Sequence, residues 1–171
     1  MEKTLRVLNR MVKDGVVEQY AIGGAVAAIF YIEPLNTNDL DVFFHLKEQN
    51  ASLDLLKPLY SYLSKQGYKS VGEAIEIEGW PVQLLPDFNP LIEEALEQAS
   101  EIKFQRTKTR VMRAEHLMAI MLQTGRLKDF ARLGQFVESG KYDEESLKVI
   151  LVRHDLLHKW KGFLAKYEKI S

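Results

Sequence analysis

Hydrophobic positions recur along the chain with a helical period in some segments and a strand period in others. The first of them, Leu5, Leu8, Met11 and Val12, lie three or four residues apart, which predicts an amphipathic helix that ends near Gly15. Short apolar runs separated by turn residues then predict strands and helices. In order these are a strand over 16–22, a short buried helix over 25–32, a strand over 39–46, a helix over 52–65 and two or three strands over 68–88.

The second half of the chain is predicted to be mostly helical. Asn89 and Pro90 supply an N-cap and a first-turn residue for a helix that runs to about Ser100. A basic stretch over 103–113 holds five Lys or Arg and no acid, and we interpret it as a solvated face, with contact to phosphate or RNA as the alternative. Four further helices are predicted over roughly 113–124, 127–138, 144–152 and 155–168.

This order of elements predicts an α+β (or α/β) fold, with a small mixed sheet in front of a helical C-terminal region. We expect an α/β core over residues 1–90 and helices over residues 91–171 packed on that core. The length of 171 residues fits one domain with a helical appendage.

Composition narrows the function classes only slightly. A formal net charge of −1 gives no overall attraction to nucleic acid or to an anionic membrane. The chain has no cysteine, which excludes disulfides and thiolate metal sites. No signal-peptide pattern and no run of about 20 apolar residues occurs, so we expect a cytoplasmic protein without a membrane partner.

Two acids interrupt the apolar pattern of the strand over 39–46. Asp39 and Asp41 are alternate residues, so their side chains point to the same face of the strand. An exposed edge strand would explain two acids facing water, but the flanking residues are apolar. Two like charges in a buried setting are costly unless a cation compensates them. Mg²⁺ suits such a pair, because it binds through one or two carboxylates together with phosphates.

Two glycines stand directly before the predicted short helix. Gly23 and Gly24 allow the backbone to approach a phosphate, and the first amides of a helix favour an anion. Together with the two acids, they predict a nucleoside triphosphate held by backbone amides at one end and by a carboxylate-bound metal at the other.

This combination resembles the nucleotidyltransferase superfamily, most closely its minimal prokaryotic members and the toxins of the AbiEii type. The resemblance is carried by the Gly-Gly pair, the short helix, a turn with Thr37 and the run DLDV at 39–42. A second likeness is the segment RAEHLMAIMLQTGRLKDFARL at 113–133, with an Arg-x-Lys-Asp turn at Arg126, Lys128 and Asp129. Together the two segments cover most of residues 16–138.

The resemblance implies transfer of a nucleoside monophosphate from an NTP to a hydroxyl, with Mg²⁺. The acceptor could be a tRNA end, a protein or a small hydroxyl compound. The roles it implies are metal binding and catalysis for Asp39 and Asp41, phosphate binding for Gly23 and Gly24, and nucleotide contacts for Thr37 and Lys128.

A third carboxylate in such proteins comes from a later strand and binds metal or acts as general base. Here Gln83 occupies the matching position, so we expect Asp87 to serve instead, with Glu76 and Glu78 across the hairpin as alternatives. The related toxins also tend to carry Lys where this chain has Met121 and Asp where it has Arg132. These departures leave a second hypothesis, a catalytically weak nucleotide-binding module that acts as an antitoxin-like or regulatory partner of another protein. A structural α+β protein without a site is a third.

Overall fold

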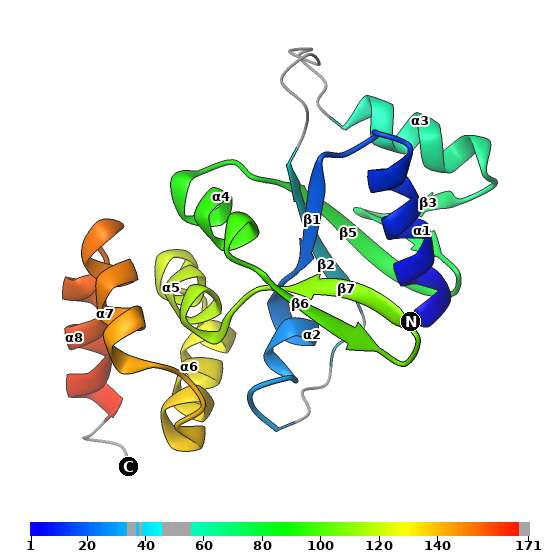
Figure 1. Ribbon diagram of the computed structural model, residues 1–171. Helices are drawn as coiled ribbons and strands as arrows, with labels where there is room; N and C mark the ends of the chain where they lie inside the picture. Colours follow the sequence, from blue (N-terminus) through cyan, green and yellow to red (C-terminus); the bar gives the residue numbers. More distant parts are fainter. Residues whose placement is uncertain (34–36, 38, 46–55, 168–171) are drawn as a thin grey trace.

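The computed structural model describes residues 1–33, 37, 39–45 and 56–167, and its elements form one mixed sheet with helices on both sides (Figure 1). In chain order the elements are α1 (Glu2–Lys13), β1 (Gln19–Ile22), α2 (Gly24–Ala28), β2 (Leu40–His45), α3 (Lys57–Lys65), β3 (Lys69–Val71), β4 (Ala74–Ile77), β5 (Trp80–Pro86), α4 (Pro90–Glu97), β6 (Ser100–Phe104), β7 (Thr107–Val111), α5 (Ala114–Thr124), α6 (Leu127–Ser139), α7 (Glu144–Arg153) and α8 (Leu157–Tyr167).

The strand that carries the acids lies at the centre of the sheet. Within the described residues the strand order is β3-β4-β5-β2-β1-β7-β6. Strand β2 runs antiparallel to β1 and parallel to β5, and its pairing with β5 sets Asp41 opposite Gln83. A central strand is buried by its neighbours along both edges, which explains the apolar residues around the acids.

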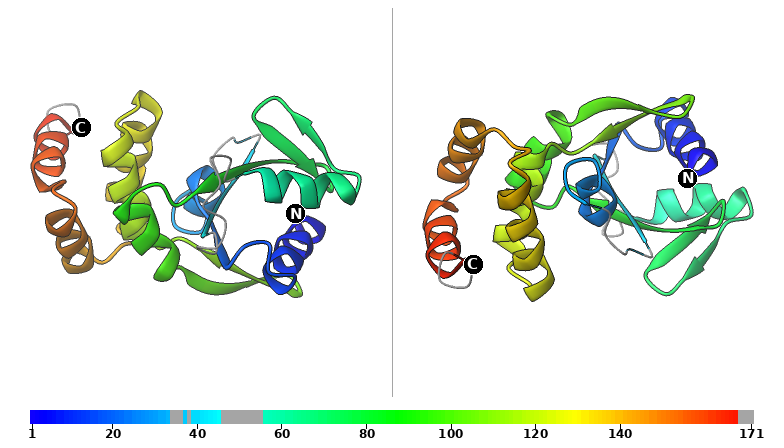
Figure 2. Two further views of the ribbon diagram at one scale, coloured as in Figure 1. Left: turned by 90° about the horizontal axis from the view of Figure 1, so that it is seen from above. Right: turned by 90° about the horizontal axis from the view of Figure 1, so that it is seen from below.

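The helices form layers on the two faces of the sheet. Helices α1 and α3 lie on one side, α2, α4, α5 and α6 on the other, and α7 and α8 form an outer layer beyond α5 and α6 (Figure 2). The core runs through these layers, and its largest fully buried side chains include Phe44 on β2 and Phe136 on α6. Among the described residues, no helix is long and apolar enough to cross a membrane.

Most of the predicted elements are present. The fold class is confirmed as α+β, with strands at β1 and β2, three strands between residues 69 and 86, and the four helices of the C-terminal part. Gly79 forms the turn of the β4–β5 hairpin, where Ile77 pairs with Trp80. Asn89 caps α4, since its side-chain oxygen accepts from the Ile92 amide at 3.0 Å. The start of the helix predicted over 52–65 lies outside the described residues, and the described helix is α3.

The basic stretch over 103–113 exposes Lys103, Arg106 and Lys108, in agreement with a solvated face, but its strand pairing was not predicted. It forms most of a β-hairpin, β6–β7, in which Thr107, Thr109 and Val111 are buried at alternate positions. Strand β7 pairs with β1, so the sheet continues past residue 90 and the purely helical part begins at α5. Arg110 donates to the carbonyls of Leu96 and Glu97 at the end of α4, at 2.8 and 3.0 Å, which gives it a structural role.

Candidate active site

The Gly23–Gly24 turn and Asp41 are in direct contact. The Gly23 amide donates to the Asp41 carbonyl at 3.0 Å. Gly24 has a φ of +57°, and a Cβ at this position would lie 1.7 Å from Asp41 Oδ2. A side chain at residue 24 would therefore collide with the carboxylate. Glycine is required here both for the backbone conformation and for the close approach of Asp41.

Asp39 is held by two side chains. Thr37 Oγ1 donates to Asp39 Oδ1 at 3.1 Å, and Gln83 Nε2 donates to Asp39 Oδ2 at 2.8 Å. Gln83 is also the residue opposite Asp41 in the β2–β5 pairing. The structure thus brings Thr37, Asp39, Asp41 and Gln83 together, on the strand face that the period of two predicts.

Asp41 lies in an environment that disfavours its negative charge. Burial and the nearby Asp39 carboxylate raise its pKa. Three cations, Arg126, Lys128 and Arg132, act in the opposite direction but do not cancel the rise. A bound cation would therefore favour the ionised form of Asp41.

A cleft with a volume of about 560 Å³ opens beside these acids. Gly24, Asp41 and Gln83 form part of one wall, and α4, α5 and α6 form the opposite wall. The opposite wall contributes Arg126 and Arg132 together with apolar side chains such as Met121 and Ile120. Phe88, which is 69% exposed, lies at the same cleft.

Arg126 is fixed at the cleft by a buried acid. Its Nε and Nη2 atoms donate to the two carboxylate oxygens of Asp129, at 2.7 and 3.1 Å. Asp129 is 1% exposed and also accepts from the Arg126 amide, which caps α6. Arg126 Nη1 has no hydrogen bond within the described part of the chain, so it is available to an anion in the cleft.

The other predicted site residues lie elsewhere. Lys128 is exposed on α6 and does not line the cleft, although it acts on Asp41 electrostatically. Asp87 pairs with His45, because the parallel strands β2 and β5 bring their final residues together, four residues beyond Gln83. Glu76 is exposed on β4, and Glu78 accepts from the Tyr68 hydroxyl at 2.8 Å. In the part of the chain that the structure describes, no third acid, histidine or cysteine joins Asp39 and Asp41 as a metal-binding group.

The donor set nevertheless fits a magnesium ion. Asp39 and Asp41 supply four carboxylate oxygens, and each oxygen that accepts one hydrogen bond retains a second acceptor position. Mg²⁺ usually binds one or two carboxylates and completes its shell with water and substrate phosphates. A divalent cation here would also relieve the repulsion that raises the pKa of Asp41.

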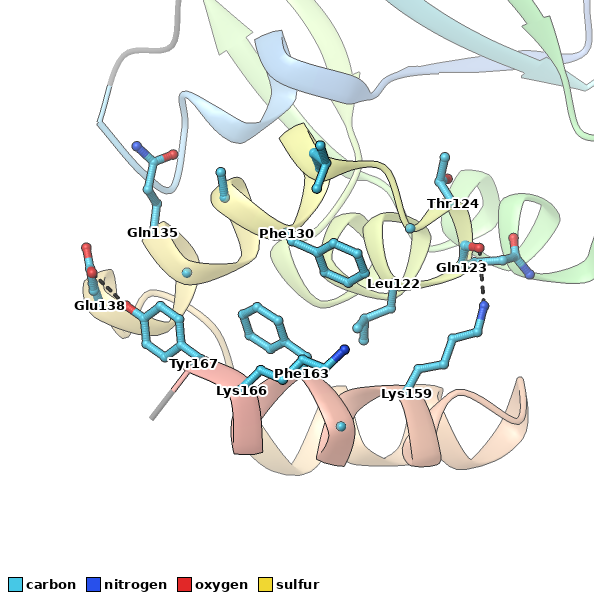
Figure 3. Close-up of a pocket in the computed structure, with 15 residues that line it drawn as sticks. Leu122, Gln123, Thr124, Phe130, Gln135, Glu138, Lys159, Phe163, Lys166 and Tyr167 are labelled. Atoms are coloured by element: carbon cyan, nitrogen blue, oxygen red, sulfur yellow. Dashed lines mark hydrogen bonds between the residues drawn. The ribbon is translucent and has the colours of Figure 1, made fainter. Parts of the chain in front are cut away.

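A second and larger cavity, of about 980 Å³, lies between α6 and α8 (Figure 3). Its lining includes Leu127, Phe130 and Gly134 of α6, whereas Arg126, Asp129 and Arg132 of the same segment face the cleft. None of the predicted site residues lines this cavity.

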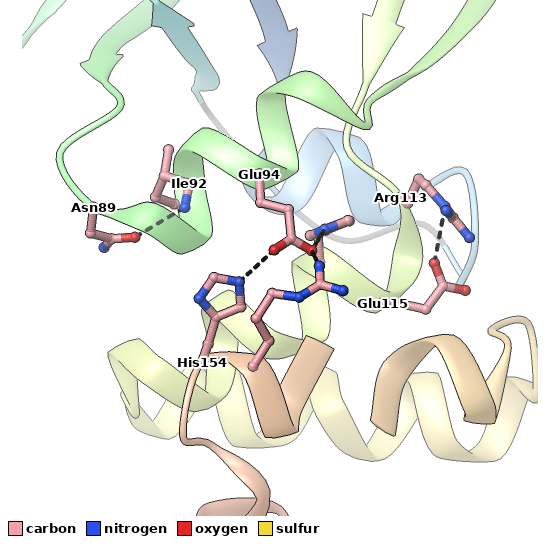
Figure 4. Close-up of polar contacts among 8 residues, drawn as sticks. Asn89, Ile92, Glu94, Arg113, Glu115 and His154 are labelled. Atoms are coloured by element: carbon pink, nitrogen blue, oxygen red, sulfur yellow. Dashed lines mark hydrogen bonds and ion pairs between the residues drawn. The ribbon is translucent and has the colours of Figure 1, made fainter. Parts of the chain in front are cut away.

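A partly buried acid, Glu94, joins the helices behind the cleft. Glu94 of α4 accepts from Arg153 and His154 of α7, both at 2.7 Å, and contacts His116 of α5 at 3.2 Å (Figure 4). Burial raises the pKa of Glu94, but the hydrogen bonds from Arg153, His154 and His116 outweigh it and lower the pKa to about 2. Glu94 therefore ties α4 and α5, which form a wall of the cleft, to the outer helix α7.

Sequence reasoning missed the cationic and aromatic parts of the cleft. Arg132 was noted only as a departure from related proteins, and Phe88 and Asn89 were not placed at the site. No local pattern marks these residues, because they reach the cleft only through the packing of α4 and α6 against the sheet.

Comparisons with known proteins support the same fold. No protein-family model matches the chain, and no curated protein is similar to it in sequence. Among solved structures, an antigenic nucleotidyltransferase-like protein from Paracoccidioides brasiliensis is similar over 97% of this chain and 92% of that chain, with 13% identity and a TM-score of 0.58. ANT(2")-Ia in complex with adenylyl-2"-tobramycin is similar over 98% and 99%, with 14% identity and a TM-score of 0.54. The chain therefore has a nucleotidyltransferase fold.

Proposed function

We propose that this protein transfers a nucleoside monophosphate from an NTP to a hydroxyl acceptor, with Mg²⁺ bound at Asp39 and Asp41. The observation that carries the proposal is the contact of the Asp41 carboxylate with Gly24, at a cleft that Arg126 and Arg132 also line. Backbone amides, paired carboxylates and cations around one cleft are the groups that a metal-bound triphosphate requires. ANT(2")-Ia, which has the same fold, is known with a nucleotidylated small molecule bound.

In this proposal each part of the cleft has one task. The Gly24 amide binds the phosphates, whereas the Gly23 amide, which the sequence predicts in the same role, donates to the Asp41 carbonyl. Thr37 holds the Asp39 carboxylate in place through its hydroxyl. Mg²⁺ would supply positive charge against the charge that develops on the phosphates during transfer. Arg126 and Arg132, which line the cleft, would stabilise the pyrophosphate, and the exposed Lys128 would add positive charge from outside the lining.

The reaction forms one bond and breaks one bond. The acceptor oxygen attacks the α-phosphorus of the NTP, a new phosphorus–oxygen bond forms, and the bond to pyrophosphate breaks. The hydroxyl proton must leave the acceptor oxygen during this step. Gln83 cannot take that proton at neutral pH, so the proton passes to solvent and the transfer is slow.

Gln83 also suggests a second candidate function. Gln83 donates to Asp39, and no third carboxylate of the described residues faces the pair. A protein of this kind could retain nucleotide binding and act as an antitoxin-like or regulatory partner of another protein. We rank it second, because the cleft keeps both acids, the glycine turn and the cations. In either role we expect the protein to act in the cytoplasm.

Transfer of label from each α-labelled NTP, with Mg²⁺, to tRNA, protein and small-molecule fractions tests the first function against the second. If the protein is the proposed enzyme, an acceptor becomes labelled, and the label is lost in Asp39→Asn and in Asp41→Asn. If the protein is only a binding module, it binds NTP in the presence of Mg²⁺ but labels no acceptor. Absence of both NTP binding and transfer would contradict both functions and leave a structural protein.

A further inference from the structure

Small residues on two facing helices open the cavity between α6 and α8. Ala131 lies on α6 and Gly162 lies on α8, so no long side chain from these positions fills the space. At Gly134 of α6 the Tyr167 ring takes the room, since a Cβ there would lie 2.8 Å from the ring. A Cβ at Gly162 would have no atom within 4 Å. The volume of about 980 Å³ lies within the range of small-molecule sites, about 300–1,000 Å³. We refer to this cavity as the α6–α8 pocket.

The interior of the α6–α8 pocket is apolar and partly aromatic. Phe130 and Phe163 stack with ring centroids 6.1 Å apart, and Leu122 lies beside them (Figure 3). Tyr167 stacks on Phe163 at 5.6 Å and donates its hydroxyl to Glu138 at 2.6 Å. This surface suits an aliphatic chain or an aromatic ring.

Two lysines add positive charge to this apolar surface. Lys159 and Lys166 extend from α8 towards α5 and α6 (Figure 3). Neither ammonium has an ion pair within the described ranges, and Lys159 reaches only the Gln123 carbonyl, at 3.4 Å. The acid of the pocket, Glu138, already accepts from Tyr167. Two unpaired ammonium groups beside an apolar wall favour an anion that is itself attached to an apolar body.

We propose that the α6–α8 pocket binds an amphiphilic anion, a small molecule with an aliphatic or aromatic body and one acidic group. The body packs on Leu122, Phe130 and Phe163, and the acidic group lies between Lys159 and Lys166. The site is distinct from the cleft at Asp41, because the two hollows use different faces of α6 and share only Gln123 and Thr124, at the end of α5, among their lining residues. It does not depend on the proposed transferase activity.

Two pairs of probes test the charge preference on the full chain. Anilinonaphthalene sulfonate is an aromatic anion, and phenylnaphthylamine is its neutral analogue; dodecanoate and dodecanol form the aliphatic pair. We expect the sulfonate to bind and dodecanoate to displace it at lower concentration than dodecanol does. Lys159→Gln and Lys166→Gln should each weaken sulfonate binding by about two- to fivefold, the strength of an exposed ion pair, and leave the neutral dye unchanged. Lys161→Gln is the matched control, since Lys161 is exposed on α8 and does not line the pocket.

A variant that fills the pocket tests its location. Gly162→Leu places a side chain in open space and removes a glycine from a helix, so folding should be kept or improved. We expect both dyes to bind at least about tenfold more weakly, which is a loss of about 1.4 kcal/mol or more, with an unchanged or higher thermal midpoint. Equal dye binding in Gly162→Leu and the parent would overturn the proposal, as would lysine variants with parental affinity for the sulfonate. A parent dimer that dissociates in Gly162→Leu, seen by sedimentation, would also overturn it and assign the pocket to a second copy of the chain.

Discussion

Gln83 Nε2 donates a hydrogen bond to Asp39 Oδ2 at 2.8 Å, at the position where the sequence resemblance predicts a third carboxylate. The amide turns its donor towards the acid pair, so its oxygen points away from Asp39. Gln83 therefore holds Asp39 in place without adding charge, and it cannot act as a general base. In the proposed function, the cleft thus keeps the two acids that would bind the metal but has no general base at residue 83.

Replacing Gln83 by an acid should increase the transfer rate. Gln83→Glu places a carboxylate beside Asp39 and Asp41, and general-base assistance is typically worth about 10²- to 10⁴-fold. We expect single-turnover transfer with Mg²⁺ to rise by a factor in this range. Gln83→Met is the control, because it removes the hydrogen bond to Asp39 without adding a carboxylate. Equal rates in the parent, Gln83→Glu and Gln83→Met would show that the third position does not limit the reaction.

A side chain at residue 24 should displace Asp41. Gly24→Ala places a methyl group on the Asp41 carboxylate and also strains a positive φ, at a cost of about 1–2 kcal/mol for the strain alone. We expect lower stability to urea and a clear loss of Mg²⁺-dependent NTP affinity. Gly72→Ala is the matched control, since Gly72 has a φ of +62° but no atom within 4 Å of its Cβ position. It should lose stability through strain yet bind NTP as the parent does, and parental NTP binding by Gly24→Ala would contradict the proposed role.

Removing the charge of Asp41 should stabilise the free protein and weaken its ligand binding. Burial and Asp39 raise the pKa of Asp41, so the folded state binds a proton more tightly than the unfolded state does. The free energy of unfolding therefore decreases as the pH rises from about 4, the ordinary range for an aspartate, through the raised pKa. In Asp41→Asn the free energy of unfolding should not show this decrease with pH, because residue 41 no longer titrates.

Thermal unfolding near pH 7, without metal or nucleotide, should give a higher midpoint for Asp41→Asn than for the parent, and the difference should shrink towards pH 4. Calorimetry should show weaker Mg²⁺ and NTP binding by the same variant. Glu73→Gln, at an exposed position in the turn between β3 and β4, is the control. A lower midpoint for Asp41→Asn at neutral pH would refute the electrostatic account of this residue.

Loss of the Glu94 carboxylate should destabilise the helical part at neutral pH. Glu94→Gln takes the charged acceptor from His116, Arg153 and His154, and we expect a loss of about 2–3 kcal/mol in the free energy of unfolding. Because the pKa of Glu94 is lowered from 4.5 to about 2, its contribution is complete above about pH 5 and disappears as the pH falls towards 2. The parent and Glu94→Gln should thus converge in acid. Glu97→Gln, an exposed position on the same helix, should match the parent throughout.

The local features of the site could be predicted from the sequence. The period of two placed Asp39 and Asp41 on one face, and the Gly-Gly pair marked the turn that now lies against Asp41. Asp87 was expected at the site from its position near Gln83, but parallel pairing of β2 with β5 brings it to His45 instead. The contact between Asp87 and His45 depends on the register of β2 and β5, which are distant in sequence, so no local pattern predicts it.

Two further features, the β6–β7 hairpin and the position of Arg126 at the cleft, depend on contacts between segments distant in sequence and could not be predicted. The β6–β7 hairpin was not predicted because its exposed positions are polar or charged and its buried positions include threonines, so no apolar run indicated a strand. Arg126 became part of the cleft through its ion pair with the buried Asp129 at the start of α6. The packing of α6 against the sheet, not the helix pattern itself, sets these groups opposite Asp41.

A crystal structure of the protein with a non-hydrolysable NTP analogue and Mn²⁺, located by its anomalous scattering, tests the central claim most directly. The account predicts a Mn²⁺ peak between the carboxylates of Asp39 and Asp41, with the triphosphate at the Gly24 amide and within reach of Arg126. A nucleotide bound elsewhere, or a metal peak that does not contact Asp39 or Asp41 at saturating Mn²⁺, would contradict it.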